Sequence, residues 1–156
     1  MLQNIFFRTF LVFSLLFFQL VQANTKTNTF HDNGNGSVSD IATGLMWQKR
    51  DDNVARLYAG AIANCDGLTL AGESDWRLPN IKELTSLVDY RVDDPAIDGS
   101  LFPGTNSARY WSVTSVESSS NEAWIVQFFT GRAEYISKVF AGETVNVYVR
   151  CVRSIR

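Results

Sequence analysis

The stretch Asp75-Trp76-Arg77-Leu78-Pro79-Asn80-Ile81-Lys82-Glu83-Leu84 carries the strongest local signal for the fold of this chain. Asn80 is a favoured helix N-cap residue, and Glu83 follows it at the three-residue spacing of a capping box. Apolar side chains then recur at the spacing of one helix face, namely Ile81, Leu84, Leu87 and Val88. The stretch therefore predicts a capped helix that begins after Asn80 and packs this face against a core.

Two interpretations are open for the residues that precede this helix. In the first, Asp75, Trp76 and Arg77 form a ligand site in which Arg77 pairs with an anion. In the second, Arg77 satisfies buried carbonyls or an acidic neighbour, while Trp76 and Trp47 fill the core. The second is favoured, because an arginine is tolerated in a protein interior only when its charge is paired.

A further helix is predicted upstream, over residues 54–66. Asp51-Asp52-Asn53 offers side chains that can cap its first turn, and Gly67 is a suitable residue to end it. Tyr58, Ile62 and Cys65 follow the i, i+4, i+7 spacing of an apolar helix face. Cys65 is therefore expected on the core side of this helix.

Short strands are predicted on both sides of the two helices. Asn33-Gly34-Asn35-Gly36 lies between candidate strands, and Asn-Gly is a strong hairpin signal because both residues tolerate positive φ. Thr43-Gly44 is a turn that leads into a short buried strand at 45–47. Later strands are expected at 110–115, 123–128, 132–136 and 145–152. Two helices packed on short, mostly antiparallel strands define an α+β fold.

The first 23 residues have the composition of a secretory signal peptide. Arg8 is their only charged side chain, and the apolar run that follows it is shorter than the roughly 20 residues needed to span a bilayer. Val21-Gln22-Ala23 supplies short residues at the positions before a cleavage site. We therefore expect cleavage near Ala23, a polar leader at 24–29, a domain at 30–153 and an extracytoplasmic location, periplasmic or secreted. An uncleaved N-terminal anchor is the alternative.

Cys65 and Cys151 are the only two cysteines, so one intramolecular disulfide is possible, and an oxidising compartment makes it the default. The last predicted strand alternates between Val145, Val147, Val149 and Cys151 on one face and Asn146, Tyr148 and Arg150 on the other. The bond would join the 54–66 helix to this strand. It would close a loop of about 87 residues and contribute about 4–5 kcal/mol to stability. The lack of a CxxC motif disfavours a zinc or redox role.

Composition limits the partners of the chain. It contains 14 Lys and Arg against 16 Asp and Glu, 46% hydrophobic residues and four Trp. This content can build a core, and the small acidic excess argues against nucleic acid, whose binding usually requires a basic surface. Once the signal peptide is removed, no association with a membrane is expected. The oligomeric state is left open.

Motifs along most of the chain together resemble one known family. The opening runs from Phe30 through Asp32-Asn33-Gly34-Asn35-Gly36-Ser37-Val38-Ser39-Asp40 to Thr43-Gly44-Leu45-Met46-Trp47-Gln48-Lys49. The centre and end comprise Ala61, Cys65, residues 71–80, Glu83-Leu84, Asp94-Pro95-Ala96-Ile97-Asp98, Phe102-Pro103, Tyr110-Trp111-Ser112 and Val149-Arg150-Cys151-Val152-Arg153. In this order they resemble the Lcl C-terminal domain family, a domain of unknown function in bacterial exported proteins, over nearly all of residues 30–153.

The resemblance implies a C-type-lectin-like fold and a structural role for the residues of the shared motifs. These are Trp47, Asp75, Trp76, Arg77, Leu78, Pro79, Trp111 and Arg150. The family's named member is an adhesin whose C-terminal domain binds sulfated glycans behind a collagen-like stalk. This chain has no Gly-X-Y repeat, so trimerisation through collagen is not implied, and its acidic excess does not favour a sulfated glycan.

Four aspartates lie close together after the capped helix, namely Asp89, Asp93, Asp94 and Asp98. Oxygen-rich loops can hold calcium, and C-type lectins use such loops to bind calcium and sugar. The Glu-Pro-Asn, Gln-Pro-Asp and Trp-Asn-Asp triplets of those lectins are missing from this chain. A solvated acidic loop is therefore favoured, with calcium as the weaker alternative, and no other cofactor is expected.

A basic and aromatic surface is a further candidate for ligand binding. Residues 132–156 carry more basic than acidic side chains and could meet an anionic glycan or an envelope component, although solvated strand ends explain the charge equally well. Tyr110, Trp111, Trp124 and Tyr135 could stack on sugar rings, but aromatic residues at strand spacing more often belong to a core. The residues expected at such a surface are Arg109, Tyr110, Arg132, Tyr135 and Lys138.

Catalytic machinery is not recognisable in the sequence. His31 is the only histidine and lies near a predicted turn, so no Ser-His or Cys-His dyad is in view. We therefore expect an exported, non-catalytic binding module that binds a glycan or a surface and serves in adhesion. A structural or accessory subunit of a periplasmic assembly is the alternative, and an enzyme is disfavoured.

Overall fold

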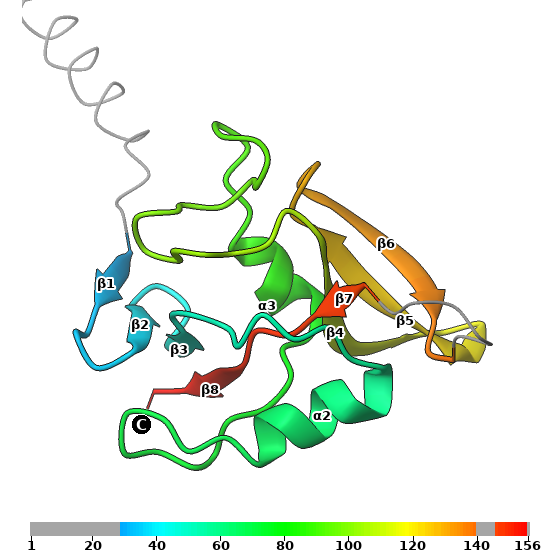
Figure 1. The fold of residues 1–156 in the computed structure, drawn as a ribbon, viewed down its shortest axis with the longest axis horizontal. Helices are drawn as coiled ribbons and strands as arrows, with labels where there is room; N and C mark the ends of the chain where they lie inside the picture. Colours follow the sequence, from blue (N-terminus) through cyan, green and yellow to red (C-terminus); the bar gives the residue numbers. More distant parts are fainter. Residues whose placement is uncertain (1–28, 140–145, 156) are drawn as a thin grey trace, which may run out of the picture.

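The computed structural model describes residues 29–139 and 146–155 (Figure 1). Within these residues the chain forms two four-stranded sheets and two helices, the α+β fold predicted from the sequence, with one disulfide. The predicted signal peptide at 1–23 lies outside the described residues, as does Val145 of the predicted last strand. Neither of the described helices has the length and hydrophobicity that crossing a bilayer requires.

The first sheet joins the N-terminal hairpin to the end of the chain. Its antiparallel strands are ordered β1-β2-β3-β8, with β1 at Phe30–Asp32, β2 at Ser37–Asp40, β3 at Leu45–Gln48 and β8 at Val152–Ser154. Residues 33–36 form the predicted hairpin turn, in which Gly34 and Gly36 adopt positive φ. β3 pairs with β8, and Trp47 lies opposite Val152. The last strand of the chain therefore belongs to the same sheet as the first three.

The second sheet contains the strands predicted in the second half of the chain. Its order is β6-β5-β4-β7, with β4 at Arg109–Val116, β5 at Ser119–Gln127, β6 at Arg132–Ser137 and β7 at Val147–Tyr148. β4, β5 and β6 are antiparallel neighbours, whereas β7 runs parallel to β4. The β4–β5 register shifts between Trp111 and Ser115 and again beside Val116, so the ladder is irregular near the hairpin end.

The two helices are α2 at Tyr58–Asp66 and α3 at Ile81–Ser86. The capping box of α3 is confirmed: the Asn80 side chain accepts the Glu83 N–H at 2.9 Å, and the Glu83 carboxylate accepts the Asn80 N–H at 2.8 Å. The predicted start of α2 at residue 54 is wrong. The N-cap is Leu57, which makes no side-chain capping bond, because the Asp51 carboxylate instead accepts a hydrogen bond from the Tyr110 hydroxyl.

Two apolar clusters cover the two faces of the second sheet. Successive side chains of a strand point to opposite faces, so Tyr110 of β4 packs in one cluster and Trp111 in the other. α3 supplies Leu84 to the first cluster, and α2 supplies Ala61 to the second. The sheet is therefore the central layer of the fold, covered by apolar side chains on both faces.

The predicted last strand is interrupted in the structure. Instead of one strand at 145–152, β7 and β8 belong to different sheets and are joined by an irregular segment at 149–151. Val147, Val149 and Cys151 are buried in the second cluster, as their alternation predicts. Arg150 lies on the opposite face, as the alternation predicts, but the first cluster covers that face: its guanidinium packs against Phe102 and Tyr110 and is fully buried.

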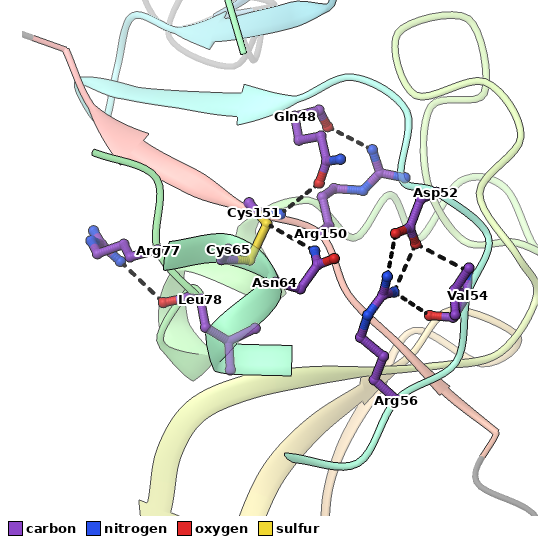
Figure 2. Close-up of a disulfide and its surroundings, with 10 residues drawn as sticks. All are labelled: Gln48, Asp52, Val54, Arg56, Asn64, Cys65, Arg77, Leu78, Arg150 and Cys151. Carbon is purple, nitrogen blue, oxygen red and sulfur yellow. Dashed lines mark hydrogen bonds and ion pairs between the residues drawn. A yellow bond between two sulfur atoms is a disulfide. The ribbon is translucent and has the colours of Figure 1, made fainter. Parts of the chain in front are cut away.

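The disulfide joins Cys65 of α2 to Cys151 in this interrupted segment (Figure 2). The two Cα atoms lie 5.4 Å apart across a sequence separation of 86 residues, and both side chains are fully buried. The predicted pairing is therefore confirmed. It fixes α2 against the C-terminal segment that enters both sheets.

The capping box makes stability depend on pH through Glu83. Burial alone would raise the pKa of Glu83, but hydrogen bonds from Arg77 and the Asn80 N–H, together with the Arg77 charge, hold the pKa below its ordinary value of 4.5. The ionised carboxylate thus stabilises the fold above pH 4.5, and this contribution is lost as the pH falls through the folded-state pKa. We expect Glu83→Gln to lower the free energy of unfolding at pH 7 by about 0.5–1 kcal/mol.

Urea titrations of both proteins from neutral to acidic pH measure this effect. The difference between wild type and Glu83→Gln should shrink as the pH falls below 4.5. A difference that stays constant or grows toward acidic pH would show that the charge of Glu83 does not stabilise α3.

Candidate functional site

Arg150 is fully buried, and its guanidinium group is bound by polar groups of this chain. Its Nη1 donates to the backbone carbonyls of Gln48 and Lys49, each at 2.7 Å, and Figure 2 shows the Gln48 bond. Its Nη2 donates to Thr105 Oγ1 at 2.7 Å and lies 3.4 Å from the Asp51 carboxylate. The guanidinium group therefore holds together three segments that are far apart in sequence, which is the structural role that the family resemblance implies.

Tyr110 belongs to this buried network and not to the surface predicted from the sequence. It is fully buried, and its hydroxyl donates to Asp51 at 2.6 Å and accepts the Asn106 N–H at 3.0 Å. Burial raises the pKa of Tyr110, so the hydroxyl stays protonated as a donor. Its side chain lies on the face of β4 that packs in the first cluster, where apolar residues of β2, β3 and α3 cover it, and this explains the correction.

The polar residues of the motif that precedes α3 are paired within the chain. Arg77 donates to both oxygens of Glu83, at 2.7 and 2.8 Å. Asp75 accepts from Arg153 Nε at 2.5 Å, and Glu73 accepts from the same guanidinium at 3.0 Å. These contacts agree with the interpretation in which the motif maintains the fold.

The apolar residues marked by the family resemblance lie in the interior. Trp76 is buried, and its indole N–H is shared between the carbonyls of Leu70 and Glu73 at 3.2 Å. The remaining residues of this group are also buried, namely Trp47, Leu78, Pro79 and Trp111. None of these five side chains presents a binding surface.

Three of the four aspartates considered for calcium binding, Asp89, Asp94 and Asp98, accept hydrogen bonds from other residues of this chain. Asp89 accepts from the Arg91 guanidinium, and Asp94 accepts from the Ser107 hydroxyl. The Ser100 hydroxyl and nearby backbone N–H groups hold the pKa of Asp98 below its ordinary value despite partial burial. No group of three or more His, Cys, Asp or Glu residues in the described ranges is placed to hold a metal ion.

The three basic residues predicted at a binding surface fall at two separate places on the second sheet. Arg109 and Arg132 are both in register with Gln127 of the intervening strand, so they flank it at one end of the sheet. Lys138 follows the opposite end of β6. There its amino group donates to the Ser115 hydroxyl and the Ser120 carbonyl, each at 2.7 Å, and lies 4.7 Å above the Tyr58 ring. The predicted set is therefore not a single basic surface.

Trp124 and Tyr135 form an aromatic pair on the other face of the same end of the sheet. They are direct cross-strand partners, and their rings meet edge to face with centroids 5.5 Å apart. Tyr135 is 53% exposed, and Trp124 is partly buried. Of the four aromatic residues considered for sugar stacking, only these two reach the surface.

An open hollow of about 520 Å³ lies beside Trp124 at the tip of the β4–β5 hairpin. Its lining combines the indole ring with hydroxyl groups and one carboxylate, from Thr114, Ser115, Val116, Glu117, Ser118 and Trp124. Such a lining can bury a flat apolar face and pair several hydroxyl groups at once. Among the described residues, this hollow is the strongest candidate for a small-ligand site.

Sequence reasoning named Trp124 as one of four residues that could stack on a sugar, but it favoured a core position for these aromatic residues and did not predict the hollow. Glu117 and the hydroxyls of Thr114 and Ser115 were not singled out, since their placement depends on the irregular β4–β5 register. The dense run of Ser and Thr residues across 112–120 was the available signal. This run alone does not indicate which of its hydroxyl groups line the hollow beside Trp124.

Comparison with known sequences identifies the family of the chain. No curated protein shows a significant sequence match to it. The family model for the Lcl C-terminal domain matches residues 36–153, which includes both sheets from β2 onward, both helices, the disulfide and the hollow. The chain therefore belongs to the Lcl C-terminal domain family.

Proposed function

We propose that this chain is an exported, non-catalytic module that binds a glycan in the hollow beside Trp124. The observation that carries the proposal is Trp124, which lines a hollow rich in hydroxyl groups and packs edge to face against the exposed ring of Tyr135. The C–H face of a sugar ring is apolar and packs on aromatic rings, while its hydroxyl groups need polar partners. Both requirements are met at one place in this fold.

The chemistry of the rest of the chain supports binding over catalysis. Both thiols are joined in the disulfide, so neither is available as a nucleophile. The disulfide also indicates an oxidising, extracytoplasmic location, in agreement with a signal peptide at 1–23. A disulfide between a helix and the C-terminal segment is also compatible with the C-type-lectin-like architecture that we propose for the fold. The mode of binding requires no cofactor.

The charge of the hollow defines the class of glycan. The described residues that line it include the carboxylate of Glu117 and no Lys or Arg. The Lys138 amino group, 2.7 Å from the Ser115 hydroxyl, offsets this carboxylate, so the hollow has no excess of positive charge to attract sulfated or carboxylated sugars. We therefore expect neutral glycans to bind better than anionic ones, in adhesion to a cell or envelope surface.

Tyr135→Ala tests the proposal, with Tyr90→Ala as a matched control. Both tyrosines are exposed, but Tyr90 lies against Gly131 at the other end of β6. The protein purified after export would be screened on an array of neutral and sulfated glycans, and the best ligand measured by calorimetry. We expect Tyr135→Ala to weaken binding about tenfold or more, which corresponds to about 1.4 kcal/mol, and Tyr90→Ala to leave it unchanged.

Two outcomes would contradict the proposal. The first is the absence of binding to every neutral glycan on the array. The second is a ligand whose affinity is the same for wild type and Tyr135→Ala, because that ligand must then bind elsewhere. Thermal unfolding of both variants checks that the exposed substitutions leave the fold intact.

A further inference from the structure

The outer edge of β6 offers backbone groups for pairing. β6 is the terminal strand of the second sheet, and within the described residues it pairs only with β5 (Figure 1). The Lys138 N–H donates to the Asn121 carbonyl at 2.9 Å, which sets the alternation of the β5–β6 ladder. The N–H and C=O groups of Ala133 and Tyr135 are then directed away from β5. An edge of this kind can accept another strand.

The side chains of β6 leave this edge accessible and charged. Five of its six residues are exposed, and Ile136 is partly buried. The strand contains no proline, and its two charged residues have opposite signs. Arg132 and Glu134 are two residues apart, so both side chains project from the same face of the strand. Neither has an ion-pair partner among the described residues.

Arg132 and Glu134 of one copy can pair with Glu134 and Arg132 of a second copy that is related by a two-fold rotation. If a second β6 lies antiparallel and centred on Ala133, Arg132 of each copy lies opposite Glu134 of the other. The outward backbone groups of the two Ala133 residues then face each other, as a hydrogen-bonded pair requires. Opposite charges at directly paired positions stabilise a sheet, and like charges destabilise it. One register therefore satisfies both the backbone and the side chains.

We propose that β6 is the contact surface of a homodimer, in which two copies of this strand pair antiparallel about Ala133. The interface is isologous, and it joins the second sheets of both protomers into one continuous sheet. Because the contact is short, the dimer is expected to be weak and to dissociate on dilution. A second copy of the chain is favoured over an unrelated strand, because only a self-complementary partner provides two Arg132–Glu134 pairs at once.

Charge reversal tests both the interface and its register. Sedimentation equilibrium of the exported protein, up to about 1 mM, gives the dimer dissociation constant. Arg132→Glu and Glu134→Arg should each raise that constant about tenfold or more, because each places like charges opposite one another at two symmetric positions. The double variant Arg132→Glu/Glu134→Arg should restore the wild-type value. Arg109→Glu is the matched control, since it makes the same charge change at an exposed position two strands away and should have little effect.

A covalent test uses the central position of the register. Paired residues at a hydrogen-bonded position have Cα atoms about 5.5 Å apart, which a disulfide can span. Ala133→Cys should therefore form an intermolecular disulfide on mild oxidation. Ser100→Cys, at an exposed loop position away from β6, should not. A protein that remains monomeric at about 1 mM would overturn the proposal. So would equal effects of Arg132→Glu and Arg109→Glu, or equal cross-linking of the two cysteine variants.

Discussion

Replacing Cys65 or Cys151 by serine is expected to lower the free energy of unfolding by about 4–5 kcal/mol. The disulfide spans 86 residues of sequence, so its loss restores much conformational freedom to the unfolded chain. Both side chains are fully buried, and a serine hydroxyl at either position would also need a hydrogen-bond partner in an apolar cluster. A typical domain has only about 5–15 kcal/mol of total stability, so each single variant should be close to unfolding at growth temperature.

Urea denaturation of the two single variants and the double variant distinguishes a shared bond from two independent contributions. The loss in Cys65→Ser/Cys151→Ser should be close to that of either single variant, because the same bond is removed in each case. Losses that add would mean that the two sulfurs do not act as a pair. Thiol titration of the native wild-type protein should detect no free cysteine, and a positive result would contradict the structure directly.

Arg150→Met is expected to lower the free energy of unfolding by about 3–5 kcal/mol, because it removes one partner of a buried ion pair. The substitution would leave the Asp51 carboxylate buried without its counter-charge and the carbonyls of Gln48 and Lys49 without their donor. Phe102, whose ring centroid lies 5.1 Å from the guanidinium carbon, would lose a cation–π contact as well. Methionine replaces the volume of the stem but none of these polar contacts.

Arg91→Met provides the matched control for this prediction. Arg91 also pairs with an aspartate, Asp89, but its side chain is 81% exposed, so water can solvate both charges after the pair is lost. Chemical denaturation should show a large loss for Arg150→Met and little change for Arg91→Met. Similar losses in the two variants would show that burial of the Arg150 network does not determine its contribution. An additional Asp51→Asn/Arg150→Met double variant should be less destabilised than the sum of its single variants.

Local signals in the sequence predicted those parts of the fold that neighbouring residues determine. Asn80 and Glu83 cap α3 because both partners lie within one helical turn, and Gly34 forms a hairpin turn through its own backbone freedom. The Cys65–Cys151 bond spans the domain, but it could be predicted since the chain offers no other pairing. The family was recognisable because several such local motifs occur in a fixed order.

The errors arose where distant contacts outweigh local pattern. The alternation at 145–152 predicted one strand, yet the segment between β7 and β8 is irregular, and its Arg150 is bound by acceptors at Gln48, Lys49 and Thr105, which are far away in sequence. Asp51 is a good capping residue by type but is committed to Tyr110, which is 59 positions away in sequence. The hollow at the β4–β5 tip was not predicted, and a core position was favoured for Trp124, since a shift in strand register has no local signature here.

The late position of β7 and β8 has a consequence for how this polypeptide matures. β7 completes one sheet, β8 completes the other, and the segment between them carries Arg150 and Cys151. During synthesis, neither sheet can be completed before residues 147–154 are available, because they supply β7 to one sheet and β8 to the other. We therefore expect both layers to close only after this segment has been made. The Cys65–Cys151 bond depends on the same segment, since Cys151 lies between the two strands.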